Sequence, residues 1–239
     1  KAHGLAAASG GTGAGGPGAA GVNEGRYLLE AEVEAAPGRN LRLFVCHWKS
    51  KLGGARETEG ARREAAALLA SRTAALLAAE PGAEFLACGD FNESPDEYLR
   101  VGRRYETALM PAEAAVQATG AGGADAAGAA QCGAGRPRLL VAGRRVDAGL
   151  SGAGVALYSP WAEASGFSYV HEGKPERIDG FLLAPGLVDG VGLHFAGFRP
   201  LDEAFLLDAA GAPRAWSSSA GSGYSDHLPL LLELALTSK

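Results

Sequence analysis

Six polar side chains of types that can carry out hydrolytic chemistry stand at the ends of short apolar runs in this sequence. The runs are LRLFVCH, EFLACG, RIDGFLLA and LPLLLEL, and each is typical of a β-strand. In layered α/β folds ligands bind where strand ends converge, so these ends would together form one polar pit. The six residues are His47, Asp90, Asn92, Asp179, Asp226 and His227.

Each of these short motifs also has a structural explanation when it stands alone. Asp and Asn are common in turns, and a single histidine on a strand is more often structural than catalytic. The combination is more specific than its parts. Carboxylate oxygens are ligands that Mg²⁺ prefers, and an aspartate beside an imidazole fixes its tautomer and favours its charged form.

Composition limits the class of protein. The chain has 239 residues, 47% of them apolar, and a net charge of −5, so bulk charge gives no support to tight binding of long nucleic acid. Cys46, Cys88 and Cys132 are too few and too widely spaced for a disulfide framework or a zinc site, and we expect Cys46 and Cys88 to be buried thiols. The sequence shows neither a bilayer-spanning apolar run nor a signal peptide.

Hydrophobic periodicity predicts an α/β domain over residues 26–239, after a flexible Gly/Ala-rich segment over residues 1–25. A strand at residues 27–35 and a second at 41–47 should form an antiparallel hairpin. A helix at residues 61–79, capped by Thr58, should turn its leucines inward and Arg62, Arg63 and Arg72 elsewhere. Further strands are expected at residues 84–89, 177–184 and 228–236, with a low-complexity insertion around residues 112–154.

Four motifs occur in a set order: HWKSK from residue 47, GDFNESP from 89, ERID from 176 and GYSDHLP from 223. Together they resemble the endonuclease/exonuclease/phosphatase superfamily, which includes apurinic endonucleases, pancreatic-type deoxyribonucleases, inositol-phosphate phosphatases and sphingomyelinases. The resemblance covers residues 26–236, and the segment FSYV from residue 167 is similar to bacterial members.

The resemblance implies a four-layered α/β sandwich of two packed mixed β-sheets flanked by helices. It also implies hydrolysis of a phosphoester, with a phosphodiester such as nucleic acid as first choice and a small-molecule or lipid phosphoester as an alternative. The cofactor would be Mg²⁺ or Mn²⁺. By motif position, Asp90 would orient and deprotonate the attacking water, and Asn92 would bind a phosphoryl oxygen or the nucleophile. His227, oriented by Asp179, and His47 would contact phosphate oxygens, and Asp226 would hold the metal.

The sequence departs from the family pattern at its beginning. The family's domain opens with two further strands that carry an Asn and a metal-binding Glu, and neither is recognisable here; Glu24 lies in a glycine-rich setting. We therefore expect a chain that lacks the first part of the domain, and a non-catalytic binding remnant is the rival interpretation. The complete protein is expected to be monomeric, without a transmembrane segment, whereas this chain would expose unpaired strand edges.

Overall fold

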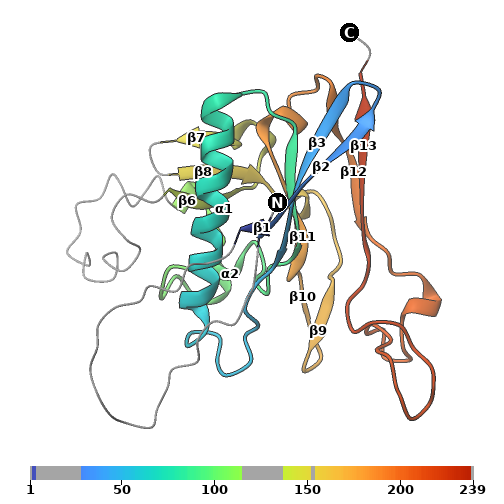
Figure 1. Ribbon diagram of the computed structural model, residues 1–239. Coiled ribbons are helices and arrows are strands. Elements are labelled where there is room, and N and C mark those ends of the chain that lie inside the picture. Colours follow the sequence, from blue (N-terminus) through green and yellow to red (C-terminus); the bar gives the residue numbers. More distant parts are fainter. Residues whose placement is uncertain (1, 4–27, 115–136, 152–153, 238–239) are drawn as a thin grey trace.

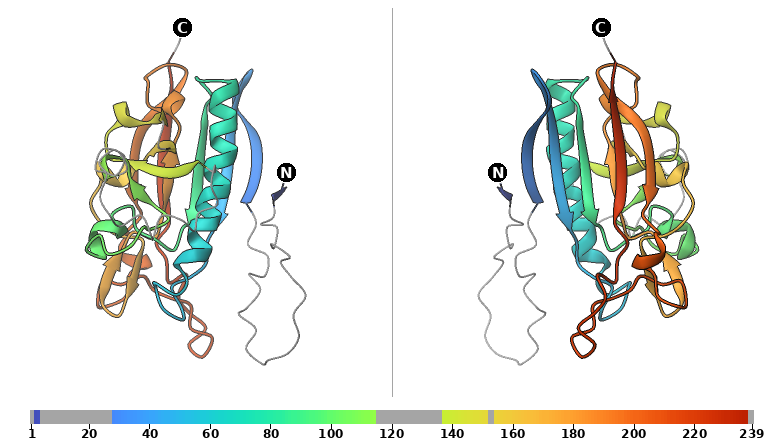
Figure 2. Two further views of the ribbon diagram at one scale, coloured as in Figure 1. Left: turned by 90° about the vertical axis from the view of Figure 1, so that its left-hand side faces the viewer. Right: turned by 90° about the vertical axis from the view of Figure 1, so that its right-hand side faces the viewer.

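The computed structural model of the protein describes residues 2–3, 28–114, 137–151 and 154–237. Its centre is a mixed β-sheet that lies between helix α1 (Glu59–Ala79) on one face and a two-stranded ribbon on the other (Figures 1 and 2). These described layers confirm the predicted α/β sandwich-like class, and the second sheet is here an antiparallel pair.

The central sheet has the strand order β1-β2-β3-β4-β11-β8-β6-β5, with β7 paired to β8. Its strands are β1 (Ala2–His3), β2 (Leu28–Ala36), β3 (Arg39–His47), β4 (Phe85–Asp90), β5 (Met110–Pro111), β6 (Arg138–Ala142), β7 (Gly149–Ser151), β8 (Gly154–Tyr158) and β11 (Asp179–Leu183). The second sheet is β12 (Leu193–Pro200) with β13 (Leu230–Leu236), and a small hairpin is β9 (Tyr169–His171) with β10 (Lys174–Glu176).

The first part of the chain folds as its hydrophobic pattern predicts. Strands β2 and β3 form the expected antiparallel hairpin, and β3 and β4 run parallel with α1 as their crossover. Thr58 stands at the N-cap position of α1, but its hydroxyl donates to Gly54 O and makes no capping bond. A parallel pair needs a crossover connection, which explains why a long helix separates two apolar runs.

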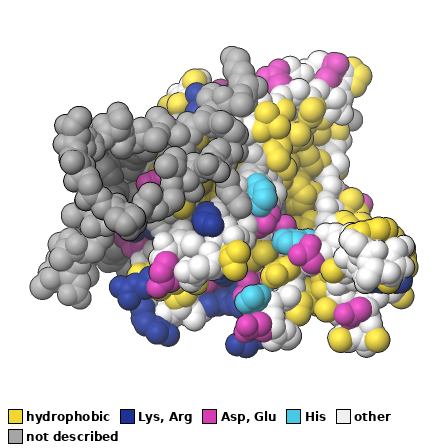
Figure 3. All heavy atoms as spheres, turned by 60° about the horizontal axis from the view of Figure 1, so that its bottom comes forward, with side chains coloured by type: hydrophobic (Ala, Val, Ile, Leu, Met, Phe, Trp, Pro, Cys, Tyr) yellow, Lys and Arg dark blue, Asp and Glu magenta, His cyan; other side chains and the backbone are white. Residues whose placement is uncertain are grey.

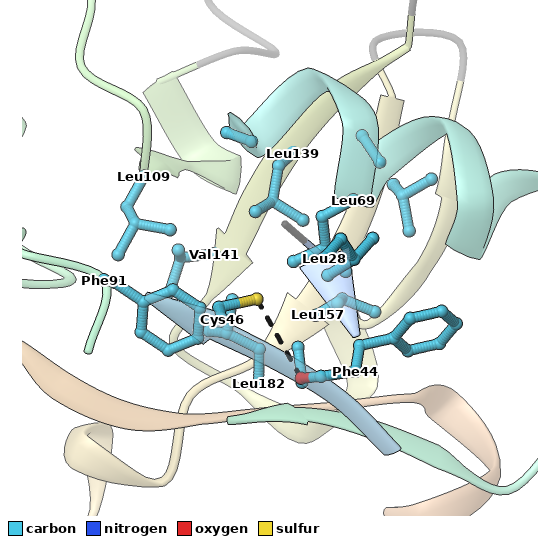
Figure 4. Packing of buried hydrophobic residues seen from close by; sticks show 14 of the residues in the cluster. Leu28, Phe44, Cys46, Leu69, Phe91, Leu109, Leu139, Val141, Leu157 and Leu182 are labelled. Atoms are coloured by element: carbon cyan, nitrogen blue, oxygen red, sulfur yellow. Dashed lines mark hydrogen bonds between the residues drawn. The ribbon is translucent and has the colours of Figure 1, made fainter. Parts of the chain in front are cut away.

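Helix α1 packs on the sheet through one continuous apolar cluster. Leu69 is fully buried, Leu77 nearly so, and both belong to a cluster with Phe44 of β3 and Leu182 of β11 (Figure 4). The Cys46 thiol lies in the same cluster and donates to Phe44 O, so this cysteine is the buried thiol expected from the sequence. Each fully buried leucine contributes about 1.5–3 kcal/mol, which makes this layer the main source of cohesion.

The opposite face of the sheet is covered by β12 and β13. Leu193 and Phe195 of β12 are buried against Leu86 and Leu183 of the central sheet, with Tyr158 fully enclosed between them. Tyr158 also contacts Phe195 at 5.8 Å between ring centroids. The two apolar faces of β4 and β11 are therefore both buried, as their uninterrupted apolar sequences indicate.

Arg62 does not face away from the core as expected. Its side chain is 1% exposed, because residues 62, 66, 69, 73 and 77 lie on one stripe of α1 that faces the sheet. Arg63 and Arg72 remain partly exposed and pair with Glu106 and Glu30. The expectation was wrong for Arg62 because a charged residue was assigned to the outer face by its type, not by its spacing.

Two expected low-complexity segments fall largely outside the described residues. Only residues 2–3 of the segment 1–25 are described, and residues 115–136 and 152–153 of the segment 112–154 are not. The rest of 112–154 contributes β6, β7 and the first residue of β8 to the central sheet, strands that the sequence pattern had not indicated. Within the described parts of the chain, no helix is long and apolar enough to span a membrane.

Gly89 is required by the approach of β3 to β4. Its φ is +131°, and a Cβ added there would lie 2.0 Å from Cys46 O. We expect Gly89→Ala to lower the free energy of unfolding by about 2–4 kcal/mol through strain and overlap. Gly60→Ala on the exposed side of α1, where a Cβ meets nothing, should be neutral or stabilising by up to about 1 kcal/mol.

Urea denaturation of the two variants beside the parent chain measures both effects. Equal midpoints for Gly89→Ala and the parent would contradict the need for glycine next to Asp90.

Candidate active site

Three of the predicted residues meet because of strand register. His47 is the partner of Asp90 across β3 and β4, and Asp90 is the partner of Asp179 across β4 and β11. The three side chains therefore stand in one row at one end of the central sheet. Figure 3 shows histidine and acidic side chains gathered on that end of the molecule, which lies at the bottom of Figure 1.

Asp90 is held by the loop that follows it. Asn92 donates to both carboxylate oxygens of Asp90, from its backbone N–H to Oδ1 and from Nδ2 to Oδ2, each at 2.7 Å. Nδ2 of Asn92 also contacts Trp48 O at 3.2 Å, and Asn92 has a left-handed φ of +51°. His47 Nε2 lies 3.6 Å from Asp90 Oδ2. The hydrogen bond from the Asn92 N–H to Asp90 Oδ1 closes an Asx turn, and this turn fixes the orientation of the Asp90 carboxylate.

The electrostatic surroundings of Asp90 make it a better base than a surface carboxylate. Burial raises the pKa of Asp90 above its ordinary value, and the Asn92 N–H lowers this pKa only in part. Asp179 raises the Asp90 pKa further, while His227 and His47 oppose that effect. A carboxylate with a raised pKa binds a proton more readily, which suits the removal of a proton from water.

His227 and Asp179 form a hydrogen-bonded pair. His227 Nδ1 lies 2.7 Å from Asp179 Oδ2, within the distance expected for such a pair. This hydrogen bond raises the pKa of His227, burial opposes it, and the charges of Asp179, Asp90 and Asp226 raise it further. Because Nδ1 is engaged by Asp179, Nε2 is the ring nitrogen available to a ligand.

Two residues beside this pair were not assigned a function from the sequence. Ser168 is fully buried, its hydroxyl accepts the Asp179 N–H at 3.1 Å, and its carbonyl accepts the Leu228 N–H at 2.7 Å. Tyr169 forms a β-bridge with His227 and packs its ring on the imidazole at 4.7 Å between centroids. The His171 ring also stacks on Tyr169, with ring centroids 6.3 Å apart.

These contacts explain how residues far apart in sequence are aligned. Tyr169, in hairpin β9–β10, pairs with His227 in the segment before β13. Ser168, which precedes this hairpin, binds Asp179 at the start of β11. These two contacts bring His227 within hydrogen-bond distance of Asp179. The sequence feature that could have indicated these contacts is the FSYV segment, whose Ser168 and Tyr169 lie about ten positions before Asp179.

Asp90, Asp179 and His227 offer a set of atoms that could hold a metal ion. One ligand atom from each lies within 4.8 Å of the others, and two carboxylates with an imidazole suit Mg²⁺ or Mn²⁺. Asp226, the ligand expected from the sequence, is exposed and lies outside this group. It is nevertheless close enough to raise the pKa values of His227 and Tyr169.

The described structure is thus an α/β sandwich with a cluster of carboxylate and imidazole side chains at one end of its main sheet. Residues 29–102 match the model of the Endonuclease/Exonuclease/phosphatase family, which confirms the expected resemblance over the part of the chain that holds the His47 and Asp90 motifs. Members of this family are metal-dependent phosphoester hydrolases. A comparison with curated proteins finds no match for the chain.

The Asp179–His227 pair gives a prediction about titration. Without metal, Asp179→Asn should lower the pKa of His227, because the principal cause of its elevation is removed. Since the folded-state pKa of His227 is raised, the pair stabilises the fold at mildly acidic pH and this contribution is lost as pH rises through that pKa. The destabilisation by Asp179→Asn should therefore shrink as pH rises.

NMR titration of the histidine ring protons, with chelator present, measures the pKa. Asp226→Asn is the matched control and should shift His227 less, because Asp226 is the last of the contributing charges. A His227 pKa that is unchanged in Asp179→Asn would contradict the assignment.

Proposed function

We propose that this chain carries the catalytic end of a magnesium-dependent phosphodiesterase that hydrolyses its substrate with water activated by Asp90. The observation that supports this most is the convergence of Asp90, Asp179 and His227 within 4.8 Å, from three separate strands or strand ends. A base, an imidazole with a raised pKa and a metal-competent carboxylate set are the parts that phosphoryl transfer requires.

The side chains divide the chemistry between them. Asp90 accepts the proton of the attacking water, and Asn92 keeps the Asp90 carboxylate oriented for that transfer. His227, charged through its bond to Asp179, donates from Nε2 to a phosphate oxygen and stabilises the charge that develops there. His47, whose side chain is 67% exposed, approaches the phosphate from the solvent side.

The cation would be held by Asp226, with Asp90 and Asp179 as the neighbouring carboxylates. When bound, Mg²⁺ or Mn²⁺ would supply positive charge to the phosphate and to the leaving oxygen. These residues fit such an ion, because each offers hard carboxylate oxygens, and Asp90 and Asp179 belong to the group whose ligand atoms lie within 4.8 Å of one another.

Nucleic acid is the substrate class we place first, because the family whose model matches residues 29–102 includes endonucleases and exonucleases. The net charge of −5 favours a smaller phosphoester or a lipid headgroup as the second candidate. The third candidate is a non-catalytic chain that binds its ligand and does not hydrolyse it; the hydrolysis assays below distinguish this candidate from the first two.

The first test is hydrolysis of plasmid DNA, abasic DNA, bis-p-nitrophenyl phosphate and sphingomyelin, each with Mg²⁺ and with chelator. We expect chelator-sensitive cleavage of at least one phosphodiester. Asp90→Asn should lower kcat by about 10²–10⁴-fold, because the amide cannot accept the proton. His194→Ala, on β12 and bonded to Gly192 O, should leave the rate unchanged. Absence of chelator-sensitive hydrolysis on every substrate would contradict the proposal.

The metal assignment is tested separately by Asp226→Asn. This change should raise the Mg²⁺ concentration that gives half-maximal rate by about 10- to 100-fold, because a charged oxygen ligand becomes neutral. The rate at saturating Mg²⁺ should fall much less. Asp189→Asn is the matched control, since Asp189 Oδ1 accepts only the local Val191 N–H in the described structure. An unchanged Mg²⁺ dependence in Asp226→Asn would assign the metal to Asp90, Asp179 and His227 instead.

A further inference from the structure

A charged cluster is buried beneath the candidate site and takes no part in the chemistry just described. Arg62 of α1 is 1% exposed, Glu93 is fully buried, and Glu59 is nearly so. Arg62 Nη2 lies 2.6 Å from Glu59 Oε2, and its Nε lies 3.2 Å from Glu93 Oε2. Charges are rarely removed from water so completely without a specific contact that requires them.

The Arg62 guanidinium also binds backbone oxygens outside its own helix. Nη1 donates to Lys49 O at 3.2 Å, and Nη2 donates to Ala55 O at 2.6 Å. Nη1 further donates to the Thr58 hydroxyl at 2.9 Å. One side chain thus joins the loop after β3, the first turn of α1 and, through Glu93, the loop after β4.

The two loops joined by Arg62 are those that carry the site. Lys49 is two residues after His47, and Glu93 directly follows Asn92. Between them, Trp48 N–H donates to Asp90 O at 2.8 Å, and Trp48 O accepts from Asn92 Nδ2. Arg62 therefore binds Lys49 O, next to Trp48, and the Glu93 carboxylate, next to Asn92. These two contacts flank the hydrogen bond between Trp48 O and Asn92 Nδ2.

Glu93 extends the same network in the other direction. Its Oε1 accepts the Leu109 N–H at 2.7 Å, so both carboxylate oxygens are engaged. Burial and the charge of Glu59 raise the pKa of Glu93, while the Leu109 N–H and Arg62 lower it. The loop after β4 is therefore attached to α1 and to the segment before β5 through a single side chain.

We propose that Arg62 is a positioning residue for the phosphoester site: by binding Lys49 O and Glu93 together, it sets the distance between the His47 loop and the Asp90–Asn92 loop. The catalytic consequence rests on the proposed function, whereas the placement of the loops does not. Helix α1, through Arg62, thus determines where the nucleophilic water is held.

A purely stabilising function would not need this arrangement. A buried ion pair contributes little net stability, because desolvation of its charges offsets their attraction, and a well-packed apolar residue would serve as well. A guanidinium, however, presents several donors in a fixed plane, and Arg62 uses them on five acceptors from three segments, the loop after β3, the first turn of α1 and the loop after β4. Lysine has the same charge and lacks that geometry.

Arg62→Lys is therefore the decisive variant, since it keeps the charge beside Glu59 and Glu93 and loses the contacts to Lys49 O and Ala55 O. Arg72→Lys makes the same change two to three turns further along α1, at a pair with Glu30 outside the site. Leu69→Val, in the apolar layer of α1, lowers stability while it keeps every hydrogen bond and ion pair of Arg62. All three are compared with the parent chain by melting temperature, kinetics and hydrogen exchange.

We expect Arg62→Lys to lower kcat by about 10- to 100-fold with a smaller change in KM, as misplacement of catalytic groups does. Hydrogen exchange should quicken in residues 47–50 and 90–94 of this variant, beyond the change in Leu69→Val at equal loss of melting temperature. Arg72→Lys should match the parent. Glu93→Gln should reproduce the effect, and the double variant should be no worse than the poorer single one.

The outcomes separate this proposal from the proposed function. If the parent chain hydrolyses nothing, the function fails and exchange in the two loops still decides the positioning. If Arg62→Lys does not fold, Glu93→Gln provides the same comparison. Loop exchange that is no faster than in Leu69→Val, or an unchanged kcat in a folded variant, overturns the proposal.

Discussion

Two carboxylates, Asp90 and Asp179, stand directly opposite each other on neighbouring strands, and much of the structure around them serves to make that pairing tolerable. Like charges at opposed positions of an antiparallel pair, with Cβ atoms about 5 Å apart, are destabilising. Compensation comes from the Asn92 N–H groups on one carboxylate and the His227 imidazole on the other. The two neighbouring carboxylates are thus flanked by an imidazole on each side, His47 beside Asp90 and His227 beside Asp179.

The strands that carry Asp90 and Asp179 are held in place mainly by hydrogen bonds to backbone atoms. The indole of Trp161 donates to Asp179 O, Ser168 accepts the Asp179 N–H, and the Phe91 N–H donates to Ile178 O. Lys51 adds an ion-pair link between the loop after β3, Glu97 and Glu176. These groups hold the main chain, and they add to the side-chain hydrogen bonds of Asp90 with Asn92 and of Asp179 with His227.

Much of the fold and the site followed from sequence, for identifiable reasons. The β2–β3 hairpin, helix α1 and strand β4 have strong periodicity, and the site residues follow strands whose register brings His47, Asp90 and Asp179 into one row. Strands β6 and β7 were not predicted, because short strands beside a Gly/Ala-rich stretch have little pattern. Arg62 was placed outside by its charge, although its spacing from Leu69 and Leu77 put it on the buried stripe.

The closure of the site by Tyr169 and His227 has a consequence for the order of folding. Asp179 and His227 are separated by 48 positions and Asp90 and Asp179 by 89, so the contacts that complete the site close long loops. Loops of that length carry a large entropic cost and form late, after local hairpins and helices. A nascent or partly unfolded chain would keep α1 on β3 and β4 yet leave His227 undocked. The Asp179–His227 contact would then form only when β13 is in place, so this hydrogen bond would report on the completion of folding itself.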